Sequence, residues 1–286
     1  MSIEPSISAL YVVATPIGNL HDISQRAIDT LNMVDIIAAE DTRHSRTLLE
    51  FHSIDTKLIS LHEHNERGRS VSLVEQIKLG KNVALISDAG TPLISDPGFR
   101  LVGEAHSNGV RVCPIPGPCA AIAALSASGL ASDRFCFEGF LASKSHARLM
   151  RLRELQNESR TMVFYEAPHR IVESLKSMQE VFGADRPAML AREISKTFET
   201  IKRSGLQELA DWVADDSNQQ RGEIVVLVEG DRSSSVAEVT EEASKIMDVL
   251  LRELSKKQAS SLCSQITGIS KKLLYQYALN VGLDTI

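Results

Sequence analysis

Short apolar runs alternate with amphipathic segments through the first 117 residues, and this alternation constrains the fold more than any other feature of the sequence. The runs are five or six residues long, which is typical of strands buried on both faces, and they lie at 9–14, 35–39, 57–61, 83–87 and 110–115. Between them come helical patterns such as Ile23, Ala27 and Leu31, which recur on one face of a helix. Strands that alternate with helices predict a parallel sheet that helices cover on both sides.

The sequence after Gly117 predicts a second domain, a linker and a helical module. Apolar runs at 134–140, 161–166, 188–192, 197–201 and 223–228 predict strands, some of them joined as hairpins, and hence a mixed sheet. A polar segment at 231–235 predicts a linker, and the patterns beyond it are helical. We therefore expect an N-terminal α/β domain with a parallel sheet at 1–117, a second α/β domain with a mixed sheet at 118–232, and a helical module at 233–286.

The longest polar loop follows the fourth predicted strand and spans residues 87–98, with the sequence Ser-Asp-Ala-Gly-Thr-Pro-Leu-Ile-Ser-Asp-Pro-Gly. A strand-to-helix connection needs only a few residues. We expect Asp96 to cap the next helix and Pro97 to open it. Three more polar or glycine-bearing loops follow predicted strands, at 15–19, 40–46 and 116–120. Because the carboxyl ends of parallel strands share one edge of a sheet, the four loops together predict a ligand site there.

The composition excludes several classes of protein. A net charge of −6 over 286 residues leaves any nucleic-acid site to local basic patches. The four cysteines and eight histidines have no metal-ligand or disulfide spacing, so no metal site is expected and a reducing cytoplasm fits. The glycine patterns of dinucleotide and ATP sites are absent, as is a nucleophile elbow. The start of the chain does not have the pattern of a signal peptide, and no apolar run has the length of a membrane span.

Two segments are strongly basic. Residues 144–153 carry a charge of +4 with no acidic residue, and residues 255–286 carry +3. The second segment contains two helical patterns on either side of Gly268, which favour a helix-turn-helix. Contact with phosphates is one interpretation of both segments, and a solvated helix face is the other.

Two charged clusters close predicted strands in the second domain. Residues 165–170 combine an aromatic ring, a carboxylate and two basic side chains, and we expect Pro168 to start the helix that follows. Basic residues are unfavourable at the positive end of a helix, which argues against a plain helix start. Residues 192–196 form the other cluster, for which a solvated strand end is an equally good interpretation.

Six stretches together resemble the bacterial small-subunit ribosomal RNA methyltransferases of the tetrapyrrole methylase superfamily: residues 14–20, 40–43, 87–98, 116–118, 165–170 and 191–193. The match extends over nearly the whole chain, and the stretch at 87–98 is highly specific. The resemblance implies two α/β domains with S-adenosylmethionine (SAM) in the cleft between them, and a homodimer. The implied reaction moves the methyl group of SAM to the ribose 2′-oxygen of a cytidine in the decoding region of 16S rRNA, cytidine 1402.

By position, the resemblance also implies which residues meet the cofactor. They lie on the loops after the first and fourth strands, at the start of the helix after the fifth, and on two strands of the second domain: Pro16, Ile17, Asp88, Ala89, Gly90, Thr91, Ile94, Cys119, Ala120, Tyr165, Glu166, Leu190 and Ala191. This set agrees with the site expected from the loops alone.

SAM carries an activated methyl group, so the protein mainly has to align the acceptor oxygen with it. A base that accepts the proton of the ribose hydroxyl would help, and Glu193, Lys196 and His169 are candidates by type and location. A lysine would first have to lose its own proton. The basic side chains considered for contact with RNA are Arg43, Arg46, Lys144, Arg148, Arg170, Lys256, Lys257, Lys271 and Lys272.

Two other functions stay open at this point. A methyltransferase of a small tetrapyrrole-like substrate needs neither the basic tail nor the basic segment at 144–153, so both argue against it. A non-catalytic ribosome-assembly factor would bind RNA and leave its cleft unused. The dense polar decoration of the cleft loops disfavours that second alternative.

Overall fold

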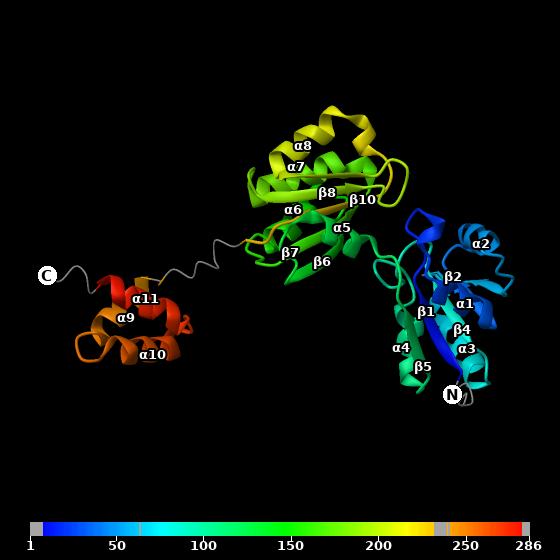
Figure 1. Ribbon diagram of the computed structural model, residues 1–286, viewed down its shortest axis with the longest axis horizontal. Coiled ribbons are helices and arrows are strands. Elements are labelled where there is room, and N and C mark those ends of the chain that lie inside the picture. Colours follow the sequence, from blue (N-terminus) through cyan, green and yellow to red (C-terminus); the bar gives the residue numbers. More distant parts are fainter. Residues whose placement is uncertain (1–7, 63, 232–238, 240, 282–286) are drawn as a thin grey trace. The chain divides into compact units, whose positions relative to one another are not determined.

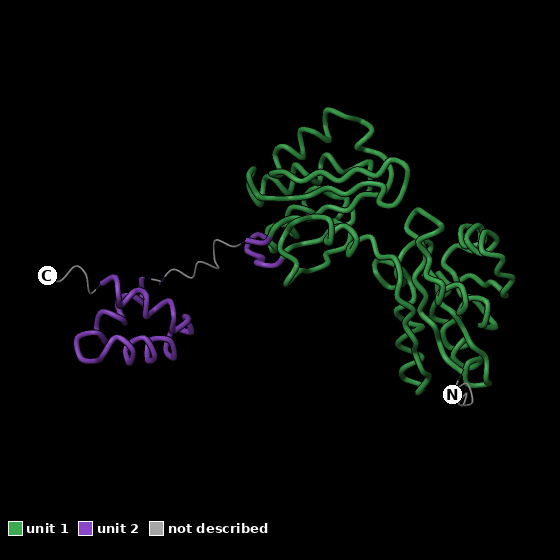
Figure 2. The backbone as a smooth tube through the Cα atoms, in the orientation of Figure 1, with its two compact units in different colours: residues 1–155, 161–229 green, residues 156–160, 230–286 purple. Residues whose placement is uncertain are grey.

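A computed structural model of the chain describes residues 8–62, 64–231, 239 and 241–281. The chain divides into two compact units, one of residues 1–155 and 161–229 and the other of residues 156–160 and 230–286 (Figure 2). The first unit contains both sheets. Most of the linker predicted at 231–235 lies outside the described residues. Among the described residues, no helix is long and apolar enough to cross a membrane.

The first sheet is parallel throughout, with the strand order β3-β2-β4-β1-β5 (Figure 1). Its strands are β1 (Ala9–Val13), β2 (Ile36–Ala39), β3 (Leu58–Ser60), β4 (Val83–Ile86) and β5 (Arg111–Ile115). The helices between them are α1 (Gln25–Met33), α2 (Thr42–Phe51), α3 (Glu66–Lys78) and α4 (Phe99–Ser107). Leu31 and Leu48 from α1 and α2 pack in one hydrophobic cluster, and Leu73 and Leu101 from α3 and α4 pack in another. The predicted parallel sheet with helices on both sides is confirmed.

The second sheet is mixed, as predicted, and has the order β6-β7-β10-β8-β9. Only β6 and β7 pair in parallel, and the other neighbours are antiparallel. Its strands are β6 (Phe135–Phe140), β7 (Thr161–Glu166), β8 (Pro187–Arg192), β9 (Thr200–Gly205) and β10 (Ile224–Val228). Its helices are α5 (Ala120–Ser128), α6 (Ser145–Glu154), α7 (Ile171–Phe182) and α8 (Leu206–Asp215), with 3-10 turns elsewhere in the unit at Leu20–Asp22, Pro168–Arg170 and Ser217–Gln220.

Three boundaries differ from the sequence predictions. The helix after the long loop begins at Phe99 behind Gly98, whose φ of 122° favours glycine, so Asp96 and Pro97 belong to the loop. The segment at 40–46 is not a loop throughout, because Asp41 caps α2 and Thr42 begins it. The strand predicted at 197–201 starts instead at Thr200, since the chain first turns through residues at positive φ.

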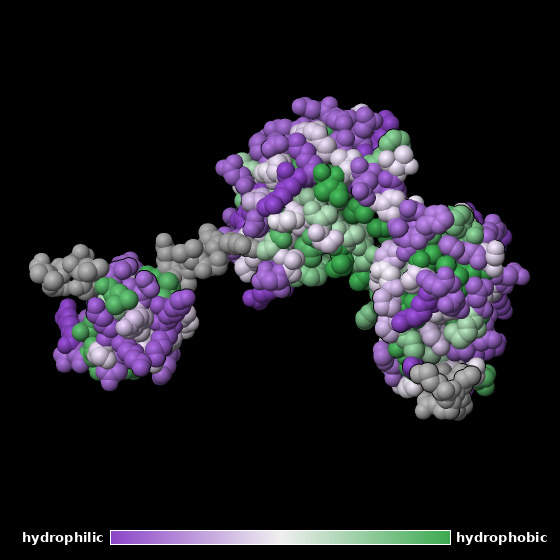
Figure 3. All heavy atoms as spheres, in the orientation of Figure 1, coloured by the Kyte–Doolittle hydropathy of each residue, from purple (hydrophilic) through white to green (hydrophobic). Residues whose placement is uncertain are grey.

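The second unit contains α9 (Glu241–Leu250), α10 (Lys256–Thr267) and α11 (Lys271–Val281). Ser255 and Gln258 form a capping box at the start of α10, and Gly268 ends that helix in the left-handed conformation. The predicted helix-turn-helix is thereby confirmed. Its small core is built from Ala243, Met247, Ala259, Cys263, Leu274 and Ala278. The face of this unit visible in Figure 3 is mostly hydrophilic, with small hydrophobic patches.

Candidate functional site

The loop at 87–98 is fixed to the loop after β1. The amide of Thr15 donates to the carbonyl of Gly90 at 2.9 Å, and the amide of Gly90 donates back to the carbonyl of Thr15 at 3.0 Å. Gly90 has a φ of 81°, which suits glycine, but Leu93 and Ser95 in the same loop also have positive φ values, 74° and 67°. Backbone strain of this kind is concentrated at functional sites.

The same loop also meets the segment after β5. The Thr91 hydroxyl donates to the carbonyl of Pro118 at 2.9 Å, and the Thr15 hydroxyl donates to the carbonyl of Ser87 at 3.2 Å. The structure therefore brings together the loops after β1, β4 and β5, as expected from their place at one edge of the sheet.

A cavity of about 360 Å³, which we call the main cavity because most of the predicted cofactor residues line it, opens beside these loops. Eight of the predicted cofactor residues line it: Ile17, Ala89, Gly90, Thr91, Ile94, Ala120, Tyr165 and Glu166. The cavity is mostly apolar with a few polar groups, which is typical of sites for small molecules. The Tyr165 hydroxyl is held in place as it accepts a hydrogen bond from the amide of Ala121 at 3.3 Å.

A second cavity of about 300 Å³ adjoins the main cavity and shares Ile17, Ala89 and Glu223 with it. Two other predicted cofactor residues, Pro16 and Asp88, line this second cavity.

Three predicted cofactor residues line neither cavity. The fully buried Leu190 packs in the cluster with α7 and α8, and Ala191, also fully buried, packs in the cluster with α5. Successive residues of a strand point to opposite faces of the sheet, and here each face is covered by a hydrophobic cluster. Both side chains therefore pack in the core. Cys119 packs against the α5 cluster at the start of that helix. Full burial leaves Leu190 and Ala191 no side-chain surface for a ligand, whereas Cys119 is half-buried and its contact with the cofactor stays a prediction.

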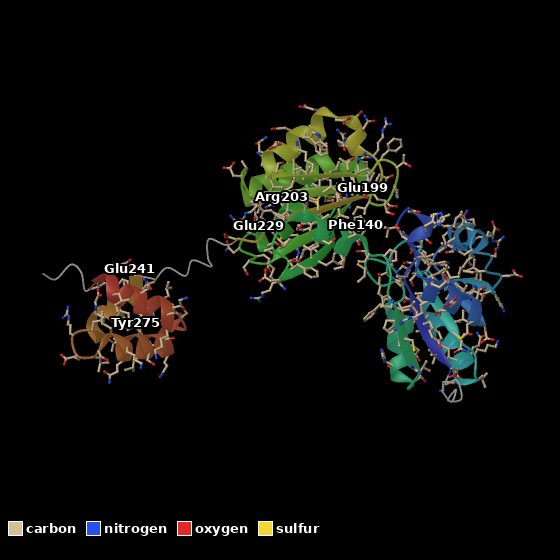
Figure 4. All side chains as sticks on the ribbon, viewed as in Figure 1. Phe140, Glu199, Arg203, Glu229, Glu241 and Tyr275 are labelled. Carbon is tan, nitrogen blue, oxygen red and sulfur yellow. The ribbon has the colours of Figure 1, made fainter. Side chains whose placement is uncertain are left out.

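Sequence reasoning missed several residues that line the main cavity: Ser95, Asp96, Phe140, Ala167, Pro168, Ile194, Gly222, Glu223, Ile224 and Val225. Ser95 and Asp96 lie in the long loop itself, where their position after a buried strand could have indicated them. Phe140, labelled in Figure 4, is the last residue of β6. Gly222 and Glu223 directly precede β10, so their place beside the cavity depends on the pairing of strands distant in sequence.

Carboxylates crowd the edge of the first sheet. The amide of Asp41 donates to Asp88 Oδ1 at 3.0 Å. Burial, together with repulsion from Asp88, Asp96 and Asp41, raises the pKa of Glu40 to about 7. Burial and repulsion from Asp88 likewise raise the pKa of Asp96 to about 6, against a hydrogen bond from Ser87 that lowers it. This edge therefore favours a cationic or hydrogen-bond-donating ligand.

The cluster at 192–196 forms an ion-paired group. Lys196 Nζ lies 2.8 Å from Glu193 Oε1 and 3.2 Å from Glu223 Oε2. Burial alone would lower the pKa of Lys196, but its bonds to Glu193 and Glu223 outweigh burial and raise it. Burial would raise the pKa of Glu193, yet its bonds to Lys196 and the Glu223 amide lower it. Lys196 therefore keeps its proton at neutral pH, which does not fit the role of a general base.

The cluster at 165–170 is organised around a buried carboxylate. Glu166 is 2% exposed, pairs with the guanidinium of Arg170, and accepts a hydrogen bond from the Ser174 hydroxyl at 2.6 Å. Arg170 is committed to this pair, so the structure does not offer it freely to RNA phosphate. His169 is exposed in the 3-10 turn that Pro168 begins, and it lines neither of the two cavities.

The other predicted RNA contacts differ in exposure. Arg148 is 2% exposed, and its guanidinium donates to the hydroxyl of Ser177 and the carbonyl of Ser143. It is a structural residue, so its prediction as an RNA contact is wrong. The remaining candidates are exposed or partly exposed: Arg43, Arg46, Lys144, Lys256, Lys257, Lys271 and Lys272.

Four of the five lysines of the second unit, Lys256, Lys257, Lys271 and Lys272, begin α10 and α11. Positive charge is unfavourable in the first turn of a helix, so their placement does not serve helix stability. Within the part of the chain that the structure describes, no cluster of three or more metal-ligating side chains is found.

Comparison with known proteins shows to which family the chain belongs. The family model of the tetrapyrrole (corrin/porphyrin) methylases matches residues 9–210, and that of the RsmI C-terminal HTH domain matches residues 237–281. The ribosomal RNA small subunit methyltransferase I of Pseudomonas aeruginosa is 58% identical over 275 residues, which cover 96% of this chain and 98% of that protein. The chain belongs to the ribosomal RNA small subunit methyltransferase I family. Members of this family from Vibrio cholerae and Escherichia coli O157:H7 are 52% and 48% identical, over 96% and 97% of this chain and 95% and 97% of their own lengths.

Solved structures of low sequence identity share the fold of this methyltransferase family. Diphthine synthase has a TM-score of 0.59 at 18% identity, over 78% of this chain and 90% of its own. Cobalt precorrin-4 methyltransferase, a cobalamin biosynthetic enzyme, also has a TM-score of 0.59, at 16% identity, over 80% of this chain and 98% of its own. The first unit thus has the tetrapyrrole methylase fold, to which this family adds its helix-turn-helix.

Proposed function

We propose that this methyltransferase transfers a methyl group from SAM to the ribose 2′-oxygen of a cytidine in the decoding region of 16S rRNA, cytidine 1402. The observation that carries the proposal is the lining of one cavity by eight residues that the family resemblance assigns to the cofactor. The relatives named as small-subunit ribosomal RNA methyltransferases, which match the chain over almost their whole length, supply the substrate class.

The residues of the main cavity fit SAM. Its apolar walls suit the adenine ring, and Gly90 presents backbone without a side chain. The neighbouring Asp88 and Asp96 carboxylates suit the ammonium and sulfonium charges of SAM. When bound there, SAM supplies the activated methyl group. The chain's own part is to hold the donor, exclude water and align the acceptor oxygen.

The proton of the ribose hydroxyl needs an acceptor. The raised pKa of Lys196 makes it the least suited of the three predicted bases, so we favour Glu193 and His169 as candidates. In this proposal Lys196 has a positioning role, because its ammonium group holds Glu193 and Glu223 together beside the second cavity.

The rest of the proposal concerns organisation. We assign residues 1–117 and 118–232 to the two α/β domains around the cofactor, and residues 233–286 to an RNA-docking module whose lysines at the starts of α10 and α11 meet phosphates. Arg43 and Arg46 on α2 and Lys144 at the start of α6 extend this contact on the first unit. We further propose that the protein is a cytoplasmic homodimer and that it acts on the small ribosomal subunit.

Methyl-labelled SAM, incubated with the protein and either small ribosomal subunits or free 16S rRNA, tests the proposal. We expect label in the RNA, confined by nuclease mapping to one cytidine of the decoding region. Label in a small-molecule fraction, or none in either RNA, would contradict it.

A further inference from the structure

Ser45 on α2 carries a buried hydroxyl that has no hydrogen-bond partner among the described residues. The residue is 3% exposed, and its backbone amide is already bonded to the carbonyl of Asp41. Buried hydroxyls nearly always have a partner, because one left unpaired is costly. Ser45 forms part of the wall of the second cavity, so a molecule there can become the missing partner once rotation about χ1 turns the enclosed hydroxyl toward it.

The polar groups that line the second cavity suit a ligand that is neutral and forms hydrogen bonds. His44, Ser45 and Thr47 of α2 form one wall, and Asp88 and Glu223 bring carboxylates to the others. Among the lining residues a single ammonium group, that of Lys196, accompanies these two carboxylates, and it pairs with Glu223. The surplus of negative charge disfavours a phosphate in the cavity, whereas the hydroxyl and amino groups of a nucleoside can donate to carboxylates.

The location of the cavity suits the methyl acceptor. It shares Ile17, Ala89 and Glu223 with the main cavity, so its occupant would adjoin the methyl donor. Arg43 and Arg46 are exposed on the same helix as Ser45, where they can meet the flanking phosphates outside the cavity.

We propose that the second cavity receives the acceptor cytidine, turned out of its RNA strand, and that the Ser45 hydroxyl is a positioning group that hydrogen-bonds it. The proposal rests on the proposed function and adds to it the subsite of the nucleoside. Turning a nucleotide out of its stack is the general way in which enzymes reach an atom that base stacking hides.

The test compares Ser45→Ala, which removes the hydroxyl, with Ser45→Leu, which fills the cavity. Ser70→Ala is the matched control, because Ser70 is equally buried but bonds to the carbonyl of Glu66 on α3, away from both cavities. For each variant we measure the SAM dissociation constant, the kcat and KM for small ribosomal subunits, and the binding of free cytidine to protein saturated with S-adenosylhomocysteine.

We expect Ser45→Ala to lower kcat/KM for subunits about threefold to tenfold through KM, the range expected for removal of one hydrogen bond. Ser45→Leu should lose cytidine binding and most of its activity on subunits, while both variants bind SAM within about twofold of the wild type. A Ser45→Leu protein that methylates subunits normally, or that loses SAM binding while Ser45→Ala keeps wild-type kinetics, would overturn the proposal.

These measurements distinguish a failure of the nucleoside subsite from a failure of the proposed function. If the wild type does not methylate subunits but binds cytidine, and Ser45→Leu abolishes that binding, the subsite stands and the proposed substrate fails. If the wild type methylates subunits and neither Ser45 variant differs from it in subunit kinetics, the function stands and the subsite fails.

Discussion

The side chain of Lys196 lies across Gly18, so that its methylene groups occupy the space that a side chain at position 18 would take. Its ammonium group continues to Glu193 and Glu223. Beside it, the Ser195 hydroxyl donates to the carboxylate of Asp22. These contacts join the loop after β8 to the segment after β1, and the absence of a side chain at Gly18 makes the approach possible.

Replacing Gly18 by alanine should therefore destabilise the protein. The added methyl group overlaps the inner carbons of Lys196 and displaces its ammonium group from the two carboxylates, at an expected cost of about 1 kcal/mol in the free energy of unfolding. Gly68→Ala in α3 is the control, because nothing lies within 4 Å of the new methyl group. It should stabilise by roughly 0.5–1 kcal/mol. Urea unfolding measures both, and equal stability of the two variants would contradict the packing.

Gly90→Val should weaken SAM binding. The space around Gly90 is adequate, with the nearest atom of Ile17 3.4 Å from a built Cβ, but its φ of 81° is strained for a β-branched residue. The loop must shift to relieve a strain of about 1–3 kcal/mol, and we expect calorimetry to show about a tenfold loss of affinity or more. Gly109→Val imposes a similar strain at a φ of 68° outside both cavities, and its SAM affinity should stay unchanged. Wild-type affinity in a folded Gly90→Val protein would refute a role of this loop in the cofactor site.

Glu40→Gln should stabilise the protein at high pH only. The pKa of Glu40 is about 7 in the folded protein against 4.5 for the free side chain, so between these values the folded state binds more protons than the unfolded state. Stability contributed by this group is therefore lost as the pH rises through that window. The full shift corresponds to about 3 kcal/mol, which partial exposure to solvent reduces to about 1 kcal/mol.

Denaturant unfolding at pH 4 and pH 8 measures this effect. The gain of the Glu40→Gln variant over the wild type should appear at pH 8 and vanish at pH 4. Glu50→Gln on the exposed side of α2 controls for the loss of one negative charge. A gain of equal size at both pH values would contradict the origin in the carboxylates around Glu40.

Glutamine at the four lysines that begin α10 and α11, Lys256, Lys257, Lys271 and Lys272, should weaken binding to small ribosomal subunits. It should also reduce the slope of log affinity against log salt by roughly 0.7–0.9 for each phosphate that the protein no longer neutralises. SAM affinity should stay at the wild-type value. Lys245→Gln on α9, where the lysine pairs with Glu241, is the control within the same unit. If the fourfold variant keeps both the affinity and the salt slope, the lysines are only a solvated face.

Most helices and strands could be predicted from the sequence, and so could the edge of the first sheet at which the candidate site lies. Periodicity identifies strands such as β1 and β7 because buried strands are continuous apolar runs. It could not place residues whose position depends on distant pairing. Leu190 and Ala191 were assigned to the cofactor, yet the register of β8 against β10 buries both in the core. Arg148 fits a basic patch in the sequence, but the packing of α6 against α7 encloses it.

The lining of the two cavities could likewise be predicted only in part from the sequence. Loops adjacent in the first sheet, such as 15–19 and 87–98, could be brought together from the sequence, since parallel strands end at one edge. Glu223 borders both cavities from the second sheet, and the unpartnered hydroxyl of Ser45 emerges only when the packing around α2 is known. Glu223 does not stand out in the sequence, because an isolated glutamate carries no pattern, and nothing distinguishes Ser45 from its neighbours in the polar segment 40–46.

The most direct test of the central claim is the position of the methyl group within the modified nucleotide. RNA from small subunits treated with the protein and labelled SAM is hydrolysed in alkali, which cleaves only where a 2′-hydroxyl is free. We predict that the label remains in an alkali-resistant dinucleotide whose first nucleoside is cytidine. Label recovered in a mononucleotide, and therefore on a base, would contradict methylation of the ribose.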